Sequence, residues 1–182
     1  MSRSAAAFPG FDSPGVGFGQ PFEMLEACHE RVQRSLTLLG KLVDYIDQNG
    51  HSTQTQSAAA DVLRYFDIAA PLHHEDEEVH VFPLLLAQGD GPLRAAVQRL
   101  QGEHQRMGEL WAAVRQPLLR WREPGVTEKV DDATRSAAKS FREIYAGHIA
   151  AEEGPVYLAA RALMDDDALA GMGQAMQARR HA

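Results

Sequence analysis

The sequence has a single cysteine, Cys28, among 182 residues, and fewer basic than acidic residues. One cysteine cannot form an intrachain disulfide, and it excludes a cysteine-rich zinc or iron–sulfur site, so we expect a reducing, cytoplasmic location. The 18 Lys and Arg residues against 25 Asp and Glu residues give a formal net charge of −7, and the basic residues are scattered along the chain. A phosphate backbone finds little to bind on such a surface, so we expect no nucleic-acid partner.

Long apolar runs are also missing from the sequence. No segment approaches the roughly 20 apolar residues of a membrane helix. Pro9 and Gly10 interrupt the start of the chain before a secretory apolar segment can form. The composition, 45% hydrophobic and 24% charged, is typical of one globular domain with a sizeable core. We therefore expect a soluble, single-domain protein with no membrane partner.

The residue pattern changes near residue 20, from a segment rich in glycine and proline to one with helical periodicity. Residues 1–20 hold four glycines and two prolines, which favours an irregular N-terminal arm. From Pro21 onward apolar residues recur at helical spacing, so we expect residues 21–182 to form the folded domain. A short amphipathic helix from about Asp167 to Arg180 is expected to end it.

Four segments carry apolar residues at steps of three and four, which is the pattern of an amphipathic helix. Turn residues around Gly50, Gly91 and Gly125 separate them. Pro71 is expected to kink the second helix just before its polar cluster. No segment alternates as a strand does. The sequence therefore predicts an all-α fold, an antiparallel up-down-up-down four-helix bundle with an irregular N-terminal arm and a short C-terminal helix.

Polar residues interrupt these apolar lines with a period of 75 residues. The repeated pairs are His29 with His104, His73 with His148, Glu77 with Glu152, and Glu78 with Glu153. Such a period indicates two helical hairpins related by a pseudo-twofold axis, each contributing the same polar groups to one centre.

Six of these residues fall on the apolar faces and are expected to converge in the bundle core. They are His29, His73, Glu77, His104, His148 and Glu152. A single histidine in an apolar stripe is usually a hydrogen-bonded core residue, but four helices with polar residues in register are a different case. Buried carboxylates and imidazoles need compensation for their lost hydration, and a pair of divalent metal ions supplies it. Imidazole and carboxylate ligands suit iron or manganese.

Several neighbouring residues leave alternatives open. Glu78 and Glu153 follow the inner glutamates and are rotated by about 100°, so we expect them to orient the imidazoles. His74 has the same spacing to Glu78 as His73 has to Glu77, and it is the inward residue if Pro71 rotates the helix. The repeat favours His73 with Glu77.

Two further residues near the proposed ligands have open roles. His80 lies one turn farther along the second apolar line and either lines the cavity or is a fifth imidazole. Cys28 precedes His29 and lies off its face, so we expect a small buried thiol there.

With these residues the sequence resembles the hemerythrin-like family of His-His-Glu cation-binding domains. The matching segments are Cys28–Glu30, His73–Pro83, Glu103–Gln105 and His148–Glu153, and the resemblance extends over nearly all of residues 21–160. It implies a bundle holding a non-heme diiron centre. The implied terminal ligands are His29, His73, His104 and His148, and the implied bridging carboxylates are Glu77 and Glu152. The implied cofactor is two iron ions with an oxo or hydroxo bridge, with manganese or zinc as alternatives.

The sequence departs from oxygen-carrying hemerythrins at one position. Their third helix supplies a second histidine one turn before the first, where this sequence has Leu100. Four imidazoles leave a more open and more symmetric site, which argues against reversible oxygen carriage. We expect a metal protein, not an enzyme, whose centre interacts with dioxygen, peroxide or nitric oxide in sensing, protection or iron handling. The alternatives are a diiron oxidase or peroxidase-type enzyme and a metal-free helical interaction module.

Overall fold

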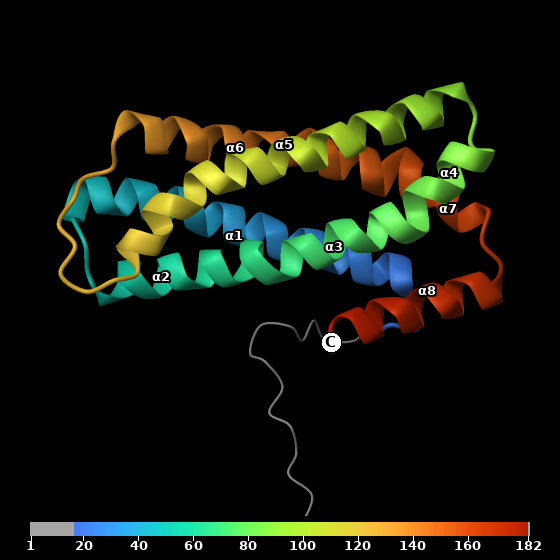
Figure 1. Ribbon diagram of the computed structural model, residues 1–182, viewed down its shortest axis with the longest axis horizontal. Helices are drawn as coiled ribbons and strands as arrows, with labels where there is room; N and C mark the ends of the chain where they lie inside the picture. Colours follow the sequence, from blue (N-terminus) through green and yellow to red (C-terminus); the bar gives the residue numbers. More distant parts are fainter. Residues whose placement is uncertain (1–16, 182) are drawn as a thin grey trace, which may run out of the picture.

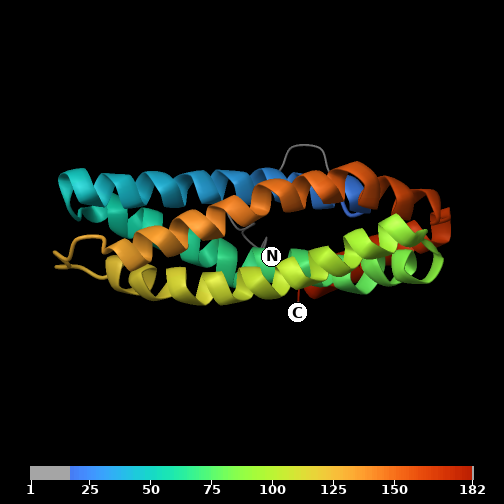
Figure 2. The same cartoon turned by 90° about the horizontal axis from the view of Figure 1, so that it is seen from above.

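The computed structural model describes residues 17–181, which form four long helical rods lying side by side (Figures 1 and 2). The first rod is α1 (Pro21–Asn49) and the third is α5 (Gly91–Trp121). The second consists of α2 (Thr53–Arg64), η1 (Tyr65–Ala69), α3 (Ala70–Asp76), η2 (Glu77–Val81) and α4 (Phe82–Gln88). The fourth consists of α6 (Asp132–Ala151), η3 (Glu152–Val156) and α7 (Tyr157–Ala162). A final helix, α8 (Asp166–Arg179), packs against α1.

The all-α fold class is confirmed, because residues 17–181 contain helices and no strand. Each rod contacts its two neighbours, with α1 against α2 and α6, and α5 against the same two helices. Most of the expected N-terminal arm lies outside the described residues, and helix α1 begins at Pro21 as the sequence predicts. Within the described part of the chain, we find no helix with the length and apolarity required to span a membrane.

Local sequence signals set the ends of the helices. Ser52 and Thr55 form a capping box at the start of α2. The carboxylates of Asp90, Asp131 and Asp165 accept hydrogen bonds from backbone N–H groups in the first turns of α5, α6 and α8. Helix α1 ends at Gly50, whose φ of 75° is a conformation that glycine adopts without steric cost.

Three π-helical turns interrupt the second and fourth rods, and prolines account for their positions. Pro71 and Pro83 each stand two residues after a π turn, η1 and η2. A proline ring clashes with the carbonyl four residues earlier, which here lies in the middle of each turn, and the wider π turn relieves that clash. Pro155 lies within η3. The kink expected at Pro71 therefore corresponds to a π turn directly before α3.

Two apolar clusters divide the bundle along its length. The larger cluster takes residues 32–46 of α1 and 107–121 of α5, whereas the smaller takes residues 22–25 and 97–100 of the same helices and the methionines of α8. The polar residues of the 75-residue repeat fall where the two clusters meet on each rod. The fold therefore surrounds a polar layer with apolar side chains at both ends.

Candidate metal centre

The structure brings all six predicted residues together in that polar layer. Together with His74, they offer ligand-type atoms in two groups, and within each group these atoms lie within 4.8 Å of one another. The first group is His29, His73, Glu77 and Glu152, and the second group is His74, His104 and His148. His104 and the buried His148 belong to the third and fourth rods, so side chains from all four rods contribute.

Glu77 lies between the two groups and turns one oxygen toward each. Its Oε1 atom is 3.4 Å from Nε2 of His73, and its Oε2 atom is 3.5 Å from Nε2 of His104. The side chain is fully buried. A carboxylate in this position can bind one ion through each oxygen.

Glu152 has the same arrangement from the opposite rod. Its Oε2 atom is 3.1 Å from Nε2 of His29, and its Oε1 atom is 2.8 Å from Nε2 of His148. Oε1 is also 3.7 Å from Nε2 of His104. The two glutamates thus face the groups in the way that the 75-residue repeat predicts for a pair of bridges.

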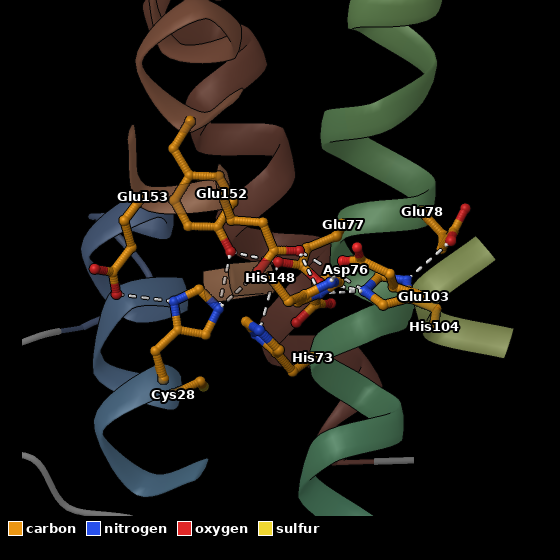
Figure 3. A network of polar contacts seen from close by, with 12 residues as sticks. Cys28, His73, Asp76, Glu77, Glu78, Glu103, His104, His148, Glu152 and Glu153 are labelled. Carbon is orange, nitrogen blue, oxygen red and sulfur yellow. Dashed lines mark hydrogen bonds and ion pairs between the residues drawn. The ribbon is translucent and has the colours of Figure 1, made fainter. Parts of the chain in front are cut away.

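Carboxylates on the outer side of the centre contact the far nitrogens of three imidazoles (Figure 3). Glu153 Oε1 is 2.9 Å from Nδ1 of His29, and Glu78 Oε1 is 3.0 Å from Nδ1 of His104. These two contacts are related by the repeat, and each carboxylate holds an imidazole of the opposite hairpin. Such contacts fix the tautomer and orientation of an imidazole and increase its basicity as a ligand.

The third outer contact breaks the repeat. Glu103 Oε2 is 2.8 Å from Nδ1 of His148, but the position equivalent to Glu103 is Cys28. Nδ1 of His73, the counterpart of His148, is buried and has no hydrogen-bond partner among the described residues. Cys28 itself is a buried free thiol, as expected.

His74 joins the second group, although the sequence analysis treated it as an alternative to His73. Its ring stacks on His104 with the centroids 4.0 Å apart, while the ring of His73 contacts His29 at 4.7 Å. The second rod packs between α1 and α5, so two adjacent residues about 100° apart can face different neighbours. The structure places His73 beside Glu77, as the repeat favours, and His74 faces the other group.

His80 lies in neither metal-capable group of the described residues. It is half-buried, and the charges of Arg179 and Asp76 act on its imidazole. Asp76 is fully buried and pairs with Arg179 and Arg180 at the end of α8. The tail helix is thus attached to the residue that precedes Glu77.

Tyr157 belongs to the centre and was missed by the sequence analysis. Its hydroxyl donates a hydrogen bond to Oε1 of Glu77 and lies 3.4 Å from Nε2 of His29. In an α-helix, a residue five positions after Glu152 is rotated by roughly 140° from its face. In η3 the N–H of Tyr157 instead bonds to the carbonyl of Glu152, which brings the two residues onto one side. The sequence signal that could have indicated this change of helical phase is Pro155, which stands within a helical segment three residues after Glu152.

The buried charges shift one another's pKa values. Burial, and then the charge of Glu152, raises the pKa of Glu77 to about 7. Burial also favours a neutral Glu152, but the close imidazoles of His104, His148 and His29 outweigh it and hold the pKa of Glu152 well below its usual range. Without metal, the centre therefore keeps one carboxylate ionised while the other takes up a proton near neutral pH.

The imidazoles also have pKa values that are shifted in opposite directions. Burial lowers the pKa of His104, but the carboxylates of Glu152 and Glu77 outweigh it and raise this pKa to about 10. Burial also lowers the pKa of His29, but the carboxylates of Glu152, Glu77 and Glu153 outweigh it, so this pKa is raised. Burial, with repulsion from neighbouring imidazoles, lowers the pKa of His73 and of His74 well below 6.5.

A pocket of about 220 Å³ reaches the second group from the side. His74 and His104 line it, and its other lining residues are mainly apolar and aromatic: Phe66, Ala70, Pro71, Met107, Gly108, Trp111, Phe141 and Tyr145. The indole N–H of Trp111 donates to Asp67 at 2.9 Å, and Arg115 binds the same carboxylate. The pocket gives a small molecule a route to these imidazoles.

The donor atoms fit a pair of cations. Oε2 of Glu77 and both carboxylate oxygens of Glu152 are buried, and apart from the imidazole nitrogens around them they have no hydrogen-bond partner among the described residues. Burying carboxylate oxygens with so few hydrogen-bond donors is costly. These oxygens and five imidazoles face a common space. Together they form the kind of donor set that iron, manganese or zinc binds.

Comparisons with known proteins point to the same chemistry. The family model described as "Hemerythrin HHE cation binding domain" matches residues 20–160. The chain is also 34% identical over 163 residues to a protein from Haemophilus influenzae (strain ATCC 51907 / DSM 11121 / KW20 / Rd), an alignment that covers 90% of this chain and 91% of the relative. That relative is described as an uncharacterized protein.

Proposed function

The chain belongs to the hemerythrin HHE cation-binding family, and from this premise we propose that it is a non-heme diiron protein whose centre reacts with a small oxidant or diatomic molecule. The observation that carries the proposal is the position of Glu77 and Glu152. Each directs one oxygen to each of two imidazole groups, which is the arrangement of two bridging carboxylates.

The proposed ligands follow from this geometry. One ion would be held by His29 and His73, and the other by His104 and His148, with Glu77 and Glu152 shared. We propose His74 as a further ligand of the second ion, because its ligand atom lies within 4.8 Å of those of His104 and His148.

Iron is the metal that the donor set and the family favour. Oxygen ligands together with imidazoles suit iron and manganese, and zinc binds similar residues. When bound, iron supplies the capacity to exchange electrons with oxygen species or nitric oxide. The free thiol of Cys28 supports a reducing compartment such as the cytoplasm.

The pocket beside His74 and His104 supports dioxygen, peroxide or nitric oxide as the partner molecule. Its walls are apolar and aromatic, and its volume of about 220 Å³ suits small molecules. Apart from His74 and His104, none of its lining residues has a charged side chain, so an organic substrate finds few anchoring groups there. The proposed role is sensing, protection or iron handling.

Metal analysis combined with spectroscopy tests the proposal. Protein purified after growth with ample iron is expected to contain two iron ions per chain and to change its visible spectrum when exposed to nitric oxide or peroxide. Trp111→Phe serves as the matched pocket variant. It widens the pocket, so it should speed the spectral change, while its metal content should equal that of the wild type. A chain that repeatedly contains one ion or none would contradict the proposal.

Two other functions predict different results. Multiple turnovers of peroxide per centre, at a rate that depends on the pocket residues, would favour an oxidase or peroxidase-type enzyme. Protein that contains no metal and whose stability is unchanged by a chelator would favour a helical interaction module.

A further inference from the structure

Tyr157 and Phe82 occupy equivalent positions of the 75-residue repeat and pack in the same way. The ring of Tyr157 stacks on His29 with the centroids 5.8 Å apart, and the ring of Phe82 stacks on His104 at 5.5 Å. Each is the first residue after a π turn that begins at one of the inner glutamates. The two side chains therefore differ chiefly by one hydroxyl group at a matched place.

That hydroxyl has a defined partner. It donates to Oε1 of Glu77, and the side chains of both residues are almost completely inaccessible to solvent. Phe82 offers no such donor to Glu152, whose two oxygens contact only imidazole nitrogens among the described residues. One inner glutamate is thus held by a neutral donor, and its counterpart is not.

We propose, on the basis of the proposed two-ion centre, that Tyr157 is a positioning residue that fixes Glu77 and makes the two bridging carboxylates unequal. Oε1 of Glu77 is the oxygen that faces the first group. A donor bonded to this oxygen restricts the rotation of the carboxylate, and such supporting contacts typically contribute about 10- to 100-fold to metal affinity. Tyr157 therefore acts mainly on the ion held by His29 and His73.

The test uses the equivalence of the two positions. Metal-free wild-type protein and the Tyr157→Phe, Phe82→Tyr and doubly exchanged variants are titrated with Co²⁺, and the two stepwise dissociation constants are measured from the visible spectrum. Tyr157→Phe is expected to weaken one binding step by about 10- to 100-fold and the other by less than about threefold. In the doubly exchanged variant the hydroxyl belongs to residue 82, so the Co²⁺ binding step that it strengthens is expected to be the other one of the two.

Two controls separate positioning from loss of structure. Tyr65→Phe also removes a hydroxyl, one that is partly buried and donates to the backbone carbonyl of Cys28, and it should leave both constants unchanged. In proton NMR spectra, an exchangeable hydroxyl resonance shifted downfield should be present in wild type and in Tyr65→Phe and missing in Tyr157→Phe. Circular dichroism of the metal-free variants verifies that each is folded.

The outcomes are distinguishable. Wild-type protein that binds fewer than two Co²⁺ ions overturns the proposed function and this inference with it. Two ions bound with unchanged constants in folded Tyr157→Phe overturn only the role of Tyr157. A phenolate-to-iron charge-transfer band in the ferric wild-type protein also overturns the inference, because Tyr157 would then be a ligand.

Discussion

The first and second groups of the centre come from equivalent positions of one repeat, yet they have different surroundings. Glu153 supports His29 in the first group, as Glu78 supports His104 in the second. Beyond these shared contacts, the second group has an additional imidazole from His74, where the repeat places Ile149. A pocket also reaches His74 and His104 of the second group.

The first group has its own distinctive features. Tyr157 donates to Glu77 there, and Nδ1 of His73 lacks the carboxylate partner that its counterpart has. The repeated residues are common to both halves, whereas the unrepeated residues give the second group an extra imidazole and a pocket and give the first group a hydroxyl beside Glu77. The following predictions test this division.

The largest effect is expected at the residues that both groups share. Glu77→Gln or Glu152→Gln replaces a carboxylate that faces both groups with a neutral amide, which keeps an oxygen for only one of them, so each variant should lose most of the metal from both. Elemental analysis of purified variants measures this loss. Glu78→Gln and Glu153→Gln serve as matched controls, and an equal loss in all four variants would contradict the assignment of the inner and outer carboxylates.

Removing the metal should also destabilise the fold. An ion that binds only the folded state stabilises it by about 4 kcal/mol when its free concentration is 1,000 times its dissociation constant. We expect a chelator to lower the melting temperature by many degrees, measured by circular dichroism. His73→Ala and His148→Ala should give helical proteins with similarly lowered melting temperatures. Coincident melting curves with and without chelator, from metal-loaded protein, would show that the polar layer is stable without ions.

The outer carboxylates should act on one group each. Glu153→Gln is expected to weaken the ion bound by the first group, and Glu78→Gln the ion bound by the second, by about 10- to 100-fold. Stepwise titration with Co²⁺ distinguishes the two ions. If either variant weakened both steps equally, the groups would behave as one unit and the comparison would fail.

Metal binding should release protons, mainly from the imidazoles with raised pKa values. At pH 7, metal-free His104, with a pKa of about 10, is protonated, and Glu77, with a pKa of about 7, is half protonated. A metal ion competes with these protons, so its affinity should increase as the pH rises from about 6 to 8. Calorimetric titrations in buffers of different ionisation enthalpy should show at least one proton released per centre. An affinity that is independent of pH would contradict these shifts.

The smallest effect is expected at the unmatched position Cys28. Cys28→Ala should cost about 1 kcal/mol of stability or less, through lost packing, and leave metal affinity unchanged. Glu103→Gln, at the equivalent position, removes the partner of His148 and should weaken the second group. Thermal unfolding and metal titration of both variants make the comparison. A large loss of metal in Cys28→Ala would assign the thiol a role at His73.

Sequence periodicity predicted the helical fold and the six residues that meet in the polar layer, because an α-helix converts spacing along the chain into a shared face. The constant interval of 75 residues aligned Glu77 with Glu152 before any tertiary contact was known. Helix ends were predicted near Gly50 and Pro21 for the same local reason, since turn and capping residues act on their immediate neighbours.

Residues whose positions depend on a break in that periodicity could not be predicted in this way. Tyr157 faces Glu77 because a π turn changes the phase of the helix after Glu152, and His74 faces His104 because the second rod packs between α1 and α5. The sequence by itself determined which side chains repeat. Only the tertiary structure decided how the two halves differ, because inequality between them arises from neighbours that are distant in the sequence and from a helical turn that does not follow the regular period.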